Sequence, residues 1–207
     1  MKRLTPAIIA PDLLAKLHAK SPALQRKSWK SSRGHARVFK NAITAQMLVI
    51  QSTRCAYCGS RLHGTKHHRD HIAPKESHPE FTFLPENLVL ACYTCDSDYK
   101  WTVDTIVTKD AAYANCTFSI IHPHFDEPSD HIQFISGVGG LLVQVVPGST
   151  KGRATVDMFH LDSPERTIQR IMVAALESDV EFLGDKWRNG FEAALAANIK
   201  MRMRPAQ

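Results

Sequence analysis

Residues 55–76 read CAYCGSRLHGTKHHRDHIAPKE, a short stretch that combines a Cys-x-x-Cys pair, several histidines and an Asp-His-Ile-x-Pro run. A second Cys-x-x-Cys pair follows at Cys92 and Cys95. Each such turn places two sulfur atoms at adjacent corners of a tetrahedron, so two pairs supply the four thiolates of a structural zinc site. We therefore predict that Cys55, Cys58, Cys92 and Cys95 bind one zinc ion.

The segment between the two cysteine pairs is longer than a plain zinc ribbon requires. Thirty-three residues separate the pairs, against roughly 15 to 20 in a ribbon. Within this insert, residues 67–75 (HHRDHIAPK) alternate like a strand, and the apolar run in residues 86–92 (ENLVLAC) predicts a second strand that leads into the second pair. We expect the adjacent side chains of Asp70 and His71 to point to opposite faces of the first strand.

Paired cysteines of this spacing are more typical of a metal site than of disulfides in a reducing compartment. A dithiol redox protein is the weaker alternative, because the sequence lacks the strand-helix-strand pattern of thioredoxins. The fifth cysteine, Cys116, stands apart, and we expect it to be a small buried apolar residue.

The order and spacing of these residues resemble the HNH nucleases, which have a ββα-metal fold. That family carries Cys-x-x-Cys, then Asp-His-x-x-Pro, then Asn-Leu, then Cys-x-x-Cys-Asn and a nearby Lys. The resemblance implies a metal-dependent endonuclease that hydrolyses phosphodiester bonds, in the first place those of DNA. The matching positions span about residues 50–104 and are Cys55, Cys58, Asp70, His71, Pro74, Asn87, Leu88, Cys92, Cys95 and Lys100.

The resemblance also implies a role for each residue of the site. His71 is the general base that activates a water molecule, and Asn87 fixes the loop that orients this base. Asp70 and Asp96 hold one catalytic Mg²⁺ or Mn²⁺ ion, while the zinc with its four thiolates is purely structural.

The chain departs from the family pattern after its last cysteine. The family usually has Asn or His at the place of Asp96, although a carboxylate is also a good ligand for Mg²⁺ or Mn²⁺. Lys100 lies one residue further along the chain than is usual. Asp98 therefore stays open as an alternative metal ligand to Asp96.

The positive charge of the chain is concentrated near its start. The formal net charge is +6, and residues 1–40 hold ten Lys or Arg against one acid, Asp12. This composition suits a polyanion, and nucleic acid is the commonest polyanionic partner. A solvated basic face without a partner remains the alternative. The residues predicted to contact nucleic acid are Lys27, Lys30, Arg33, Arg37, His68, Arg69, Lys75 and Lys100.

The predicted fold class is α+β, with a zinc-stabilised ββα-metal core, an N-terminal basic helical arm and a C-terminal extension of a hairpin and helices. The corresponding ranges are 1–45 for the arm, 46–108 for the core and 109–207 for the extension.

Within the arm, apolar residues at helical spacing predict helical structure over 4–20, with its prolines at helix starts or in turns. Residues 38–54 predict a helix that leads to the first cysteine pair. The polar basic segment 21–35 between them is expected to be mobile without a ligand.

Within the extension, apolar alternation around three glycines predicts a hairpin over 130–148, and residues 154–161 are expected to add a third strand. Ser163 is predicted to cap a helix that has Pro164 at its first position. A last amphipathic helix is expected over about 182–201.

The histidines of the extension form a second polar cluster. His122, His124, His131 and Asp126 could hold a metal, but we favour histidines that are satisfied by hydrogen bonds in a turn.

Composition places the protein among globular, non-membrane proteins. Of its 207 residues, 43% are apolar and 22% are charged, as in ordinary folded domains. No apolar run approaches the roughly 20 residues of a membrane span, and residues 1–20 lack the features of a signal peptide. We therefore expect a cytoplasmic protein that does not contact the membrane.

Two further expectations concern biological context. Residues 120–132 and 159–171 resemble the C-terminal extensions of HNH proteins from bacterial anti-phage defence loci, which implies a defence role and a protein partner such as an ATPase. The competing hypothesis is a catalytically degenerate zinc module that binds nucleic acid or a protein.

Overall fold

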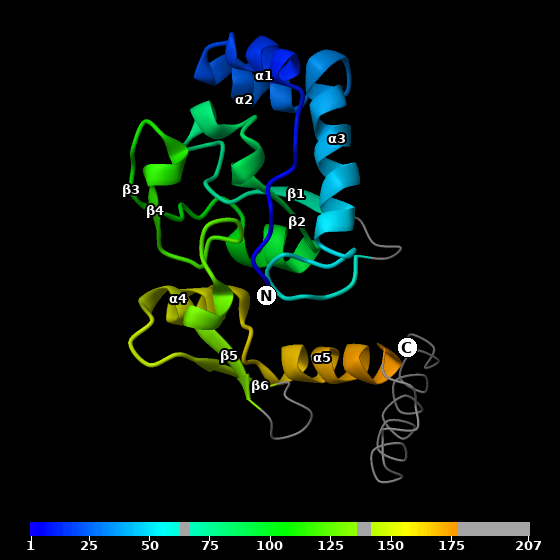
Figure 1. Ribbon diagram of the computed structural model, residues 1–207, viewed down its shortest axis with the longest axis vertical. Coiled ribbons are helices and arrows are strands. Elements are labelled where there is room, and N and C mark those ends of the chain that lie inside the picture. Colours follow the sequence, from blue (N-terminus) through cyan, green and yellow to red (C-terminus); the bar gives the residue numbers. More distant parts are fainter. Residues whose placement is uncertain (63–66, 136–141, 178–207) are drawn as a thin grey trace, which may run out of the picture.

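The structure is a computed structural model that describes residues 1–62, 67–135 and 142–177. The described strands form three two-stranded antiparallel sheets, accompanied by five described α-helices (Figure 1). This mixed architecture confirms the predicted α+β class. In chain order the elements are α1 (Pro11–His18), α2 (Pro22–Trp29), α3 (Gly34–Ile50), β1 (His68–His71), β2 (Leu88–Ala91), the π-helix η3 (Thr94–Lys100), β3 (Ile106–Thr108), β4 (Thr117–Phe118), β5 (Ile132–Ile135), β6 (Leu142–Val145), α4 (Thr150–Phe159) and α5 (Pro164–Glu177).

The sheet of β1 and β2 lies at the centre of the site and is fixed to the end of α3. The two predicted strands pair antiparallel, with His71 opposite Leu88. Gln51, directly after α3 and buried, donates from Nε2 to the Leu90 carbonyl at 2.8 Å and accepts from the Leu90 N–H at 2.8 Å. These bonds satisfy backbone groups that an edge strand would otherwise leave open.

The segment before α1 is extended and belongs to the core. Leu4 and Ile9 are buried. Gln46 of α3 bonds both backbone groups of Ile8, accepting from its N–H at 2.8 Å and donating to its carbonyl at 2.7 Å. Helical structure begins only at Pro11, because the fixed φ angle of proline suits the first turn of a helix.

The basic segment 21–35 contains a helix that the sequence analysis did not predict. It contains α2, whose last residue, Trp29, packs against Phe39 with ring centroids 6.4 Å apart and against Phe83 at 5.6 Å. These contacts place an aromatic side chain of the segment against the core. The helix predicted over 38–54 is confirmed as α3.

The predicted hairpin is confirmed by the antiparallel pairing of β5 with β6. Its glycine turn and the helix predicted over 182–201 lie outside the described residues. The third strand predicted at 154–161 is wrong, because this sequence forms most of α4. Ser149 caps α4 by accepting from the Gly152 N–H at 2.9 Å. The buried residues Gly152, Thr155, Val156 and Phe159 are spaced three and four apart, so they follow one face of the helix.

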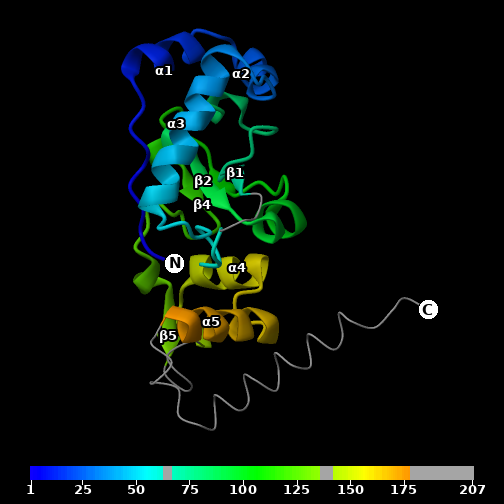
Figure 2. The ribbon, with the colours of Figure 1, turned by 90° about the vertical axis from the view of Figure 1, so that its right-hand side faces the viewer.

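The extension supports the core through α4 and α5, which lie at the opposite end of the molecule from α1 and α2 (Figure 2). Phe159 of α4 stacks on Tyr57 between the first two cysteines, with ring centroids 4.1 Å apart. Helix α5 begins as predicted, since the Ser163 hydroxyl accepts from the Arg166 N–H at 3.2 Å and Pro164 is the first helical residue.

The helices that the structure describes do not have the properties of membrane-spanning segments. None of its helices combines the length and the apolar character that crossing a bilayer requires.

Candidate metal centre and active site

The four cysteines of the two pairs converge on one point. Their sulfur atoms all lie within 4.8 Å of one another, and Sγ of Cys58 is 3.7 Å from Sγ of Cys92. A tetrahedral zinc site with Zn–S bonds of about 2.3 Å places its sulfur atoms about 3.8 Å apart. The donor set and the spacing therefore fit a structural zinc ion that is bound by thiolates alone.

Polar groups surround this sulfur cluster. The Ser60 hydroxyl lies 3.1 Å from Sγ of Cys58, and Nη2 of Arg166 donates to Sγ of Cys95 at 3.5 Å. Arg166 is only 8% exposed, and its guanidinium lies over the Tyr99 ring. A zinc ion with four thiolates carries two net negative charges, which this buried cation partly offsets. Sequence reasoning missed Arg166, because it lies in α5, far from the motif.

The π-helix η3, which contains Cys95, explains the unusual position of Lys100. In a π-helix each N–H bonds the carbonyl five residues earlier, and here the Trp101 N–H donates to the Asp96 carbonyl at 2.7 Å. Cys95 and Lys100 are five residues apart and therefore share one face of η3, and both are fully buried. The wide turn thus returns Lys100 to the core despite the extra residue.

Asp70 lies in a buried network between the two cysteine pairs. Its Oδ2 accepts from the Tyr57 hydroxyl at 2.5 Å, and its Oδ1 lies 3.0 Å from Nζ of Lys100. Burial raises the pKa of Asp70 to about 6, helped by the nearby Asp96 and opposed by Lys100 and Tyr57. Sequence reasoning did not single out Tyr57, although the residue lies inside the first Cys-x-x-Cys turn.

The prediction that Lys100 contacts nucleic acid is wrong. Its side chain is 0% exposed, and its ammonium donates to Asp70 and, at 2.6 Å, to the His71 carbonyl. Because a buried charge needs such partners, Lys100 holds the Asp-His segment in place and does not reach the surface.

His71 is buried, and one hydrogen bond fixes its tautomer. Its Nε2 lies 3.0 Å from the Thr82 carbonyl, and because a carbonyl only accepts, Nε2 carries the proton and Nδ1 keeps the lone pair. The Trp29 ring packs edge-on against the imidazole at 4.4 Å. Burial lowers the pKa of His71 well below its usual value, with Lys75 and Lys100 acting in the same direction. The imidazole is therefore neutral at neutral pH.

Asn87 fastens the loop that follows His71. Its Oδ1 accepts from the Ala73 N–H at 2.7 Å, and its Nδ2 donates to the carbonyls of Ala73 and Phe81 at 3.0 and 3.1 Å. A second bond to Oδ1 comes from the Tyr113 hydroxyl at 2.8 Å. The side chain thus ties both ends of the loop between Ala73 and Phe81 to the start of β2.

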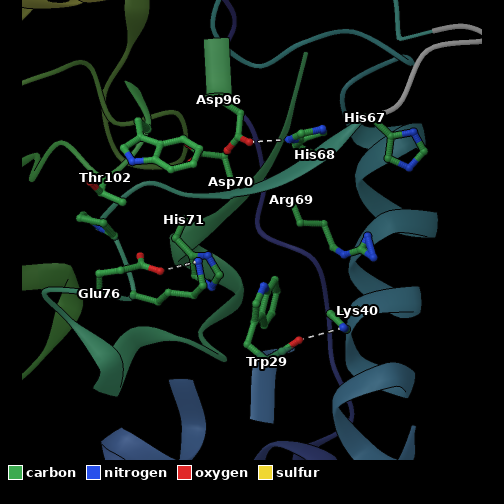
Figure 3. Close-up of a pocket in the computed structure, with 13 residues that line it drawn as sticks. Trp29, Lys40, His67, His68, Arg69, Asp70, His71, Glu76, Asp96 and Thr102 are labelled. Carbon is green, nitrogen blue, oxygen red and sulfur yellow. Dashed lines mark hydrogen bonds and ion pairs between the residues drawn. The ribbon is translucent and has the colours of Figure 1, made fainter. Parts of the chain in front are cut away.

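A pocket of about 420 Å³ opens beside these residues. At one end, Nδ1 of His68 lies 2.5 Å from Oδ2 of Asp96, as Figure 3 shows. Asp98 is exposed and does not line the pocket, whereas Asp96 does. The lining residues are Trp29, Lys40, His67, His68, Arg69, Asp70, His71, Pro74, Lys75, Glu76, Asp96, Trp101 and Thr102.

A basic depression adjoins this pocket and shares Lys40 and Arg69 with it. Arg33 and Arg37 of the α3 region line the same depression. Lys40 donates to the Trp29 carbonyl at 2.9 Å, which holds it between the two hollows. Burial and the charge of Arg69 lower the pKa of Lys40, so the two cations lie close together. Of the other residues predicted to contact nucleic acid, His68 and Lys75 line the pocket, and Lys27 and Lys30 are exposed near the end of α2.

The histidines of the extension are satisfied by hydrogen bonds. Nε2 of His122 lies 3.0 Å from the Tyr113 hydroxyl, and Nε2 of His124 lies 3.0 Å from the Leu88 carbonyl. Nδ1 of His131 lies 2.8 Å from the Ser149 hydroxyl. Among the described residues, the four cysteines are the one compact group of three or more metal-ligand side chains. These histidines therefore stabilise the packing of the extension.

The sulfur cluster predicts one zinc ion per chain. Cys92→Ser is expected to lower the zinc content well below one and to destabilise the core, because such sites couple metal binding to folding. Elemental analysis of the purified full chain measures this content. Cys116→Ser is the matched control, since Cys116 is buried away from the cluster, and it should keep its zinc. Full zinc content in Cys92→Ser would contradict the prediction.

The chain is similar to one protein family and to two known proteins. Residues 55–100 match the HNH endonuclease family. Over 132 residues the chain is 26% identical to the Septu protein PtuB of Bacillus thuringiensis, a match that covers 62% of this chain and 44% of that protein. Over 102 residues it is 30% identical to protein ea31 of Escherichia phage lambda, covering 46% and 31% respectively.

The matched region coincides with the site described above. It begins at Cys55 and ends at Lys100, so it contains both cysteine pairs, the Asp-His dyad and the π-helix. The chain spans less than half the length of the curated relatives it matches. The resemblance found from the sequence is thereby confirmed, since residues 55–100 of this chain are similar to the HNH endonuclease family.

Proposed function

We propose that this chain is a metal-dependent endonuclease that hydrolyses phosphodiester bonds in DNA as part of a bacterial anti-phage defence. The observation that carries the proposal is the state of His71, a neutral buried histidine whose Nδ1 is unprotonated and which lines the same pocket as Asp70 and Asp96. The similarity to the Septu protein and the resemblance of residues 120–132 and 159–171 to extensions of defence-locus HNH proteins support the biological role.

In this mechanism, His71 takes a proton from the attacking water at Nδ1. The Thr82 carbonyl accepts from Nε2 throughout, so it fixes the tautomer and stabilises the imidazolium that forms. The Trp29 ring and the loop held by Asn87 keep the imidazole from rotating. The ion pair with Lys100 fixes the position of the Asp70 carboxylate. This contact keeps the Asp-His segment rigid during the reaction.

We propose that Asp70 and Asp96 would hold a divalent cation. Both carboxylates line the pocket, and Mg²⁺ is usually bound by one or two carboxylates together with waters and substrate phosphate oxygens. The ion would neutralise charge on the phosphate and on the leaving oxygen. His68 is positioned to orient Asp96 through the short contact between them.

One observation favours a second candidate, a non-catalytic zinc module that binds nucleic acid or a protein. Both oxygens of Asp70 already have hydrogen-bond partners, Tyr57 and Lys100. In that case the Asp-His dyad would serve the fold alone. In either case, we propose that a protein partner such as an ATPase supplies target choice, because a small HNH core has little surface for reading bases.

Replacement of the general base separates these two candidates. His71→Ala is expected to lower plasmid cleavage with Mg²⁺ or Mn²⁺ roughly a hundredfold or more, since a positioned base contributes about 10²- to 10⁴-fold. The nicking rate of supercoiled plasmid by the full chain, alone and with its partner, is the measurement. His131→Ala, a histidine in the extension, is the control. Equal rates for His71→Ala and the wild type would leave the zinc module as the better account.

The metal ligands are tested by three substitutions after the last cysteine. Asp96→Ala is expected to lose metal-dependent cleavage while keeping zinc, whereas Asp96→Asn restores the usual family residue and should retain appreciable activity. Asp98→Ala should cleave like the wild type, because Asp98 is exposed outside the pocket. Metal titrations of the cleavage rate measure these effects. Loss of cleavage in Asp98→Ala with normal rates in Asp96→Ala would move the ligand to Asp98.

The basic depression predicts the salt dependence of DNA binding. Each phosphate contact that is removed should reduce the slope of log K against log salt by about 0.9 for duplex DNA. The double substitution Arg33→Ala and Arg37→Ala is therefore expected to flatten the slope by up to about 2. Fluorescence anisotropy at several salt concentrations measures it. Arg153→Ala, an exposed arginine of α4, is the control, and an unchanged slope in the double variant would remove the depression from the binding surface.

A further inference from the structure

Trp101 occupies a backbone position that disfavours a large side chain. It directly follows η3, and its φ and ψ angles are 45° and −116°. The Val103 N–H donates to the Lys100 carbonyl at 2.8 Å, which closes a turn with Trp101 at its first central position. Positive φ with such a ψ is the type II′ arrangement, which glycine dominates because it has no β-carbon.

The strained turn holds an indole in water at the edge of the active site. Trp101 is 66% exposed, although burial of a large aromatic side chain is strongly favourable. The ring lines the same pocket as His71 and Asp96. The turn cannot relax easily, because it follows Lys100, which is fixed in the core. The backbone strain at Trp101 and the exposure of its side chain both lower the stability of the fold. Residues with strained backbone angles cluster at functional sites.

Two cations of the pocket, Arg69 and Lys40, lie across from this turn. Figure 3 shows Thr102, the neighbour of Trp101, on one side of the pocket, with Arg69 and Lys40 on the other. A nucleic-acid strand whose phosphates follow Arg69 and Lys40 would bring one phosphate to His71 and turn a nucleobase toward Trp101. A second exposed aromatic residue, Tyr93, packs edge-on against His68 at 5.5 Å.

The surroundings of the indole suit a nucleotide better than a protein surface. Apart from Trp29, Pro74 and Trp101, the residues that line the pocket are charged or polar. A protein interface would instead surround an aromatic anchor with further apolar contacts. Aromatic side chains stack on nucleobases with little regard to sequence, but the base must first leave the stack of its own helix.

We propose that Trp101 is a stacking platform for an unpaired nucleobase next to the phosphate that is cut. The substrate class of the site is then single-stranded or locally unpaired DNA. This inference rests on the proposed function for the identity of the reaction, but base stacking by Trp101 can be measured without any cleavage.

Binding by the full, zinc-loaded chain without added Mg²⁺ or Mn²⁺ tests the platform. Fluorescence anisotropy compares a labelled 15-nucleotide oligothymidylate with a hairpin duplex, and an oligouridylate of equal length distinguishes RNA from DNA as the source of the base. Trp101→Ala is expected to weaken oligothymidylate binding roughly tenfold or more and duplex binding much less. Trp101→Phe should retain most of the affinity.

Two further variants separate a loss of stacking from a loss of stability. Trp101→Gly suits the turn, so it should melt at the wild-type temperature or above it while losing single-strand affinity like Trp101→Ala. Phe134→Ala removes an exposed aromatic side chain of β5 and should change neither affinity. Wild-type single-strand affinity in Trp101→Gly, or equal losses for single strands and duplex, would overturn the proposal. So would a Trp101→Ala variant that loses only the binding of a protein partner.

Cleavage separates this inference from the proposed function. If the chain binds single strands through Trp101 but cuts no DNA, the stacking site stands and the nuclease proposal fails. If Trp101→Ala cuts single-stranded and duplex circles in the wild-type ratio, the nuclease stands and the stacking site fails.

Discussion

The buried ion pair between Asp70 and Lys100 joins the two halves of the HNH core. Removing both charges from water costs several kcal/mol, and such a pair is stable only when further hydrogen bonds satisfy it. Here the Tyr57 hydroxyl and the His71 carbonyl supply those bonds. Asp70 comes from β1, Tyr57 from the first cysteine turn and Lys100 from the π-helix that contains Cys95. The network therefore joins the two segments that the sulfur cluster also joins, and it adds β1 to them. Phe159 stacks on Tyr57 and thereby links the extension to this network.

Glutamine side chains in helix α3 and directly after it hydrogen-bond the backbone of two other segments. Gln46 bonds both polar groups of Ile8, and Gln51 does the same for Leu90. One stretch is the extended N-terminal segment, and the other is the edge strand of the central sheet. An amide side chain is suited to this task, because it carries a donor and an acceptor side by side, like the backbone itself. The N-terminal residues are thus part of the core that supports His71. Among them, Trp29 packs directly against the His71 ring.

The parts of the fold that local spacing determines could be predicted, and the parts that depend on distant packing could not. The two cysteine turns, β1, β2, the hairpin and the start of α5 each have a signal within a few residues. The strand predicted at 154–161 failed because the alternating apolar residues were followed, whereas Thr155, Val156 and Phe159 lie on one face of a helix that Ser149 caps. The pairing of Trp29 with His71 joins residues far apart in the chain, and no local pattern indicates it. Lys100 was misplaced because residue spacing alone does not distinguish a π-helix from an α-helix.

The π-helix also shows how a core of this kind can accommodate an added residue. One residue inserted into an α-helix rotates everything beyond it by about 100°, which here would turn the lysine away from Asp70 and displace the chain that follows. A single widened turn absorbs the insertion within η3, so the cysteine before it and the lysine after it keep their partners. Only the intervening positions 96–99 are shifted around the helix axis. A changed side chain at position 96 can therefore alter the pocket without disturbing the buried Cys95 and Lys100 on either side of it.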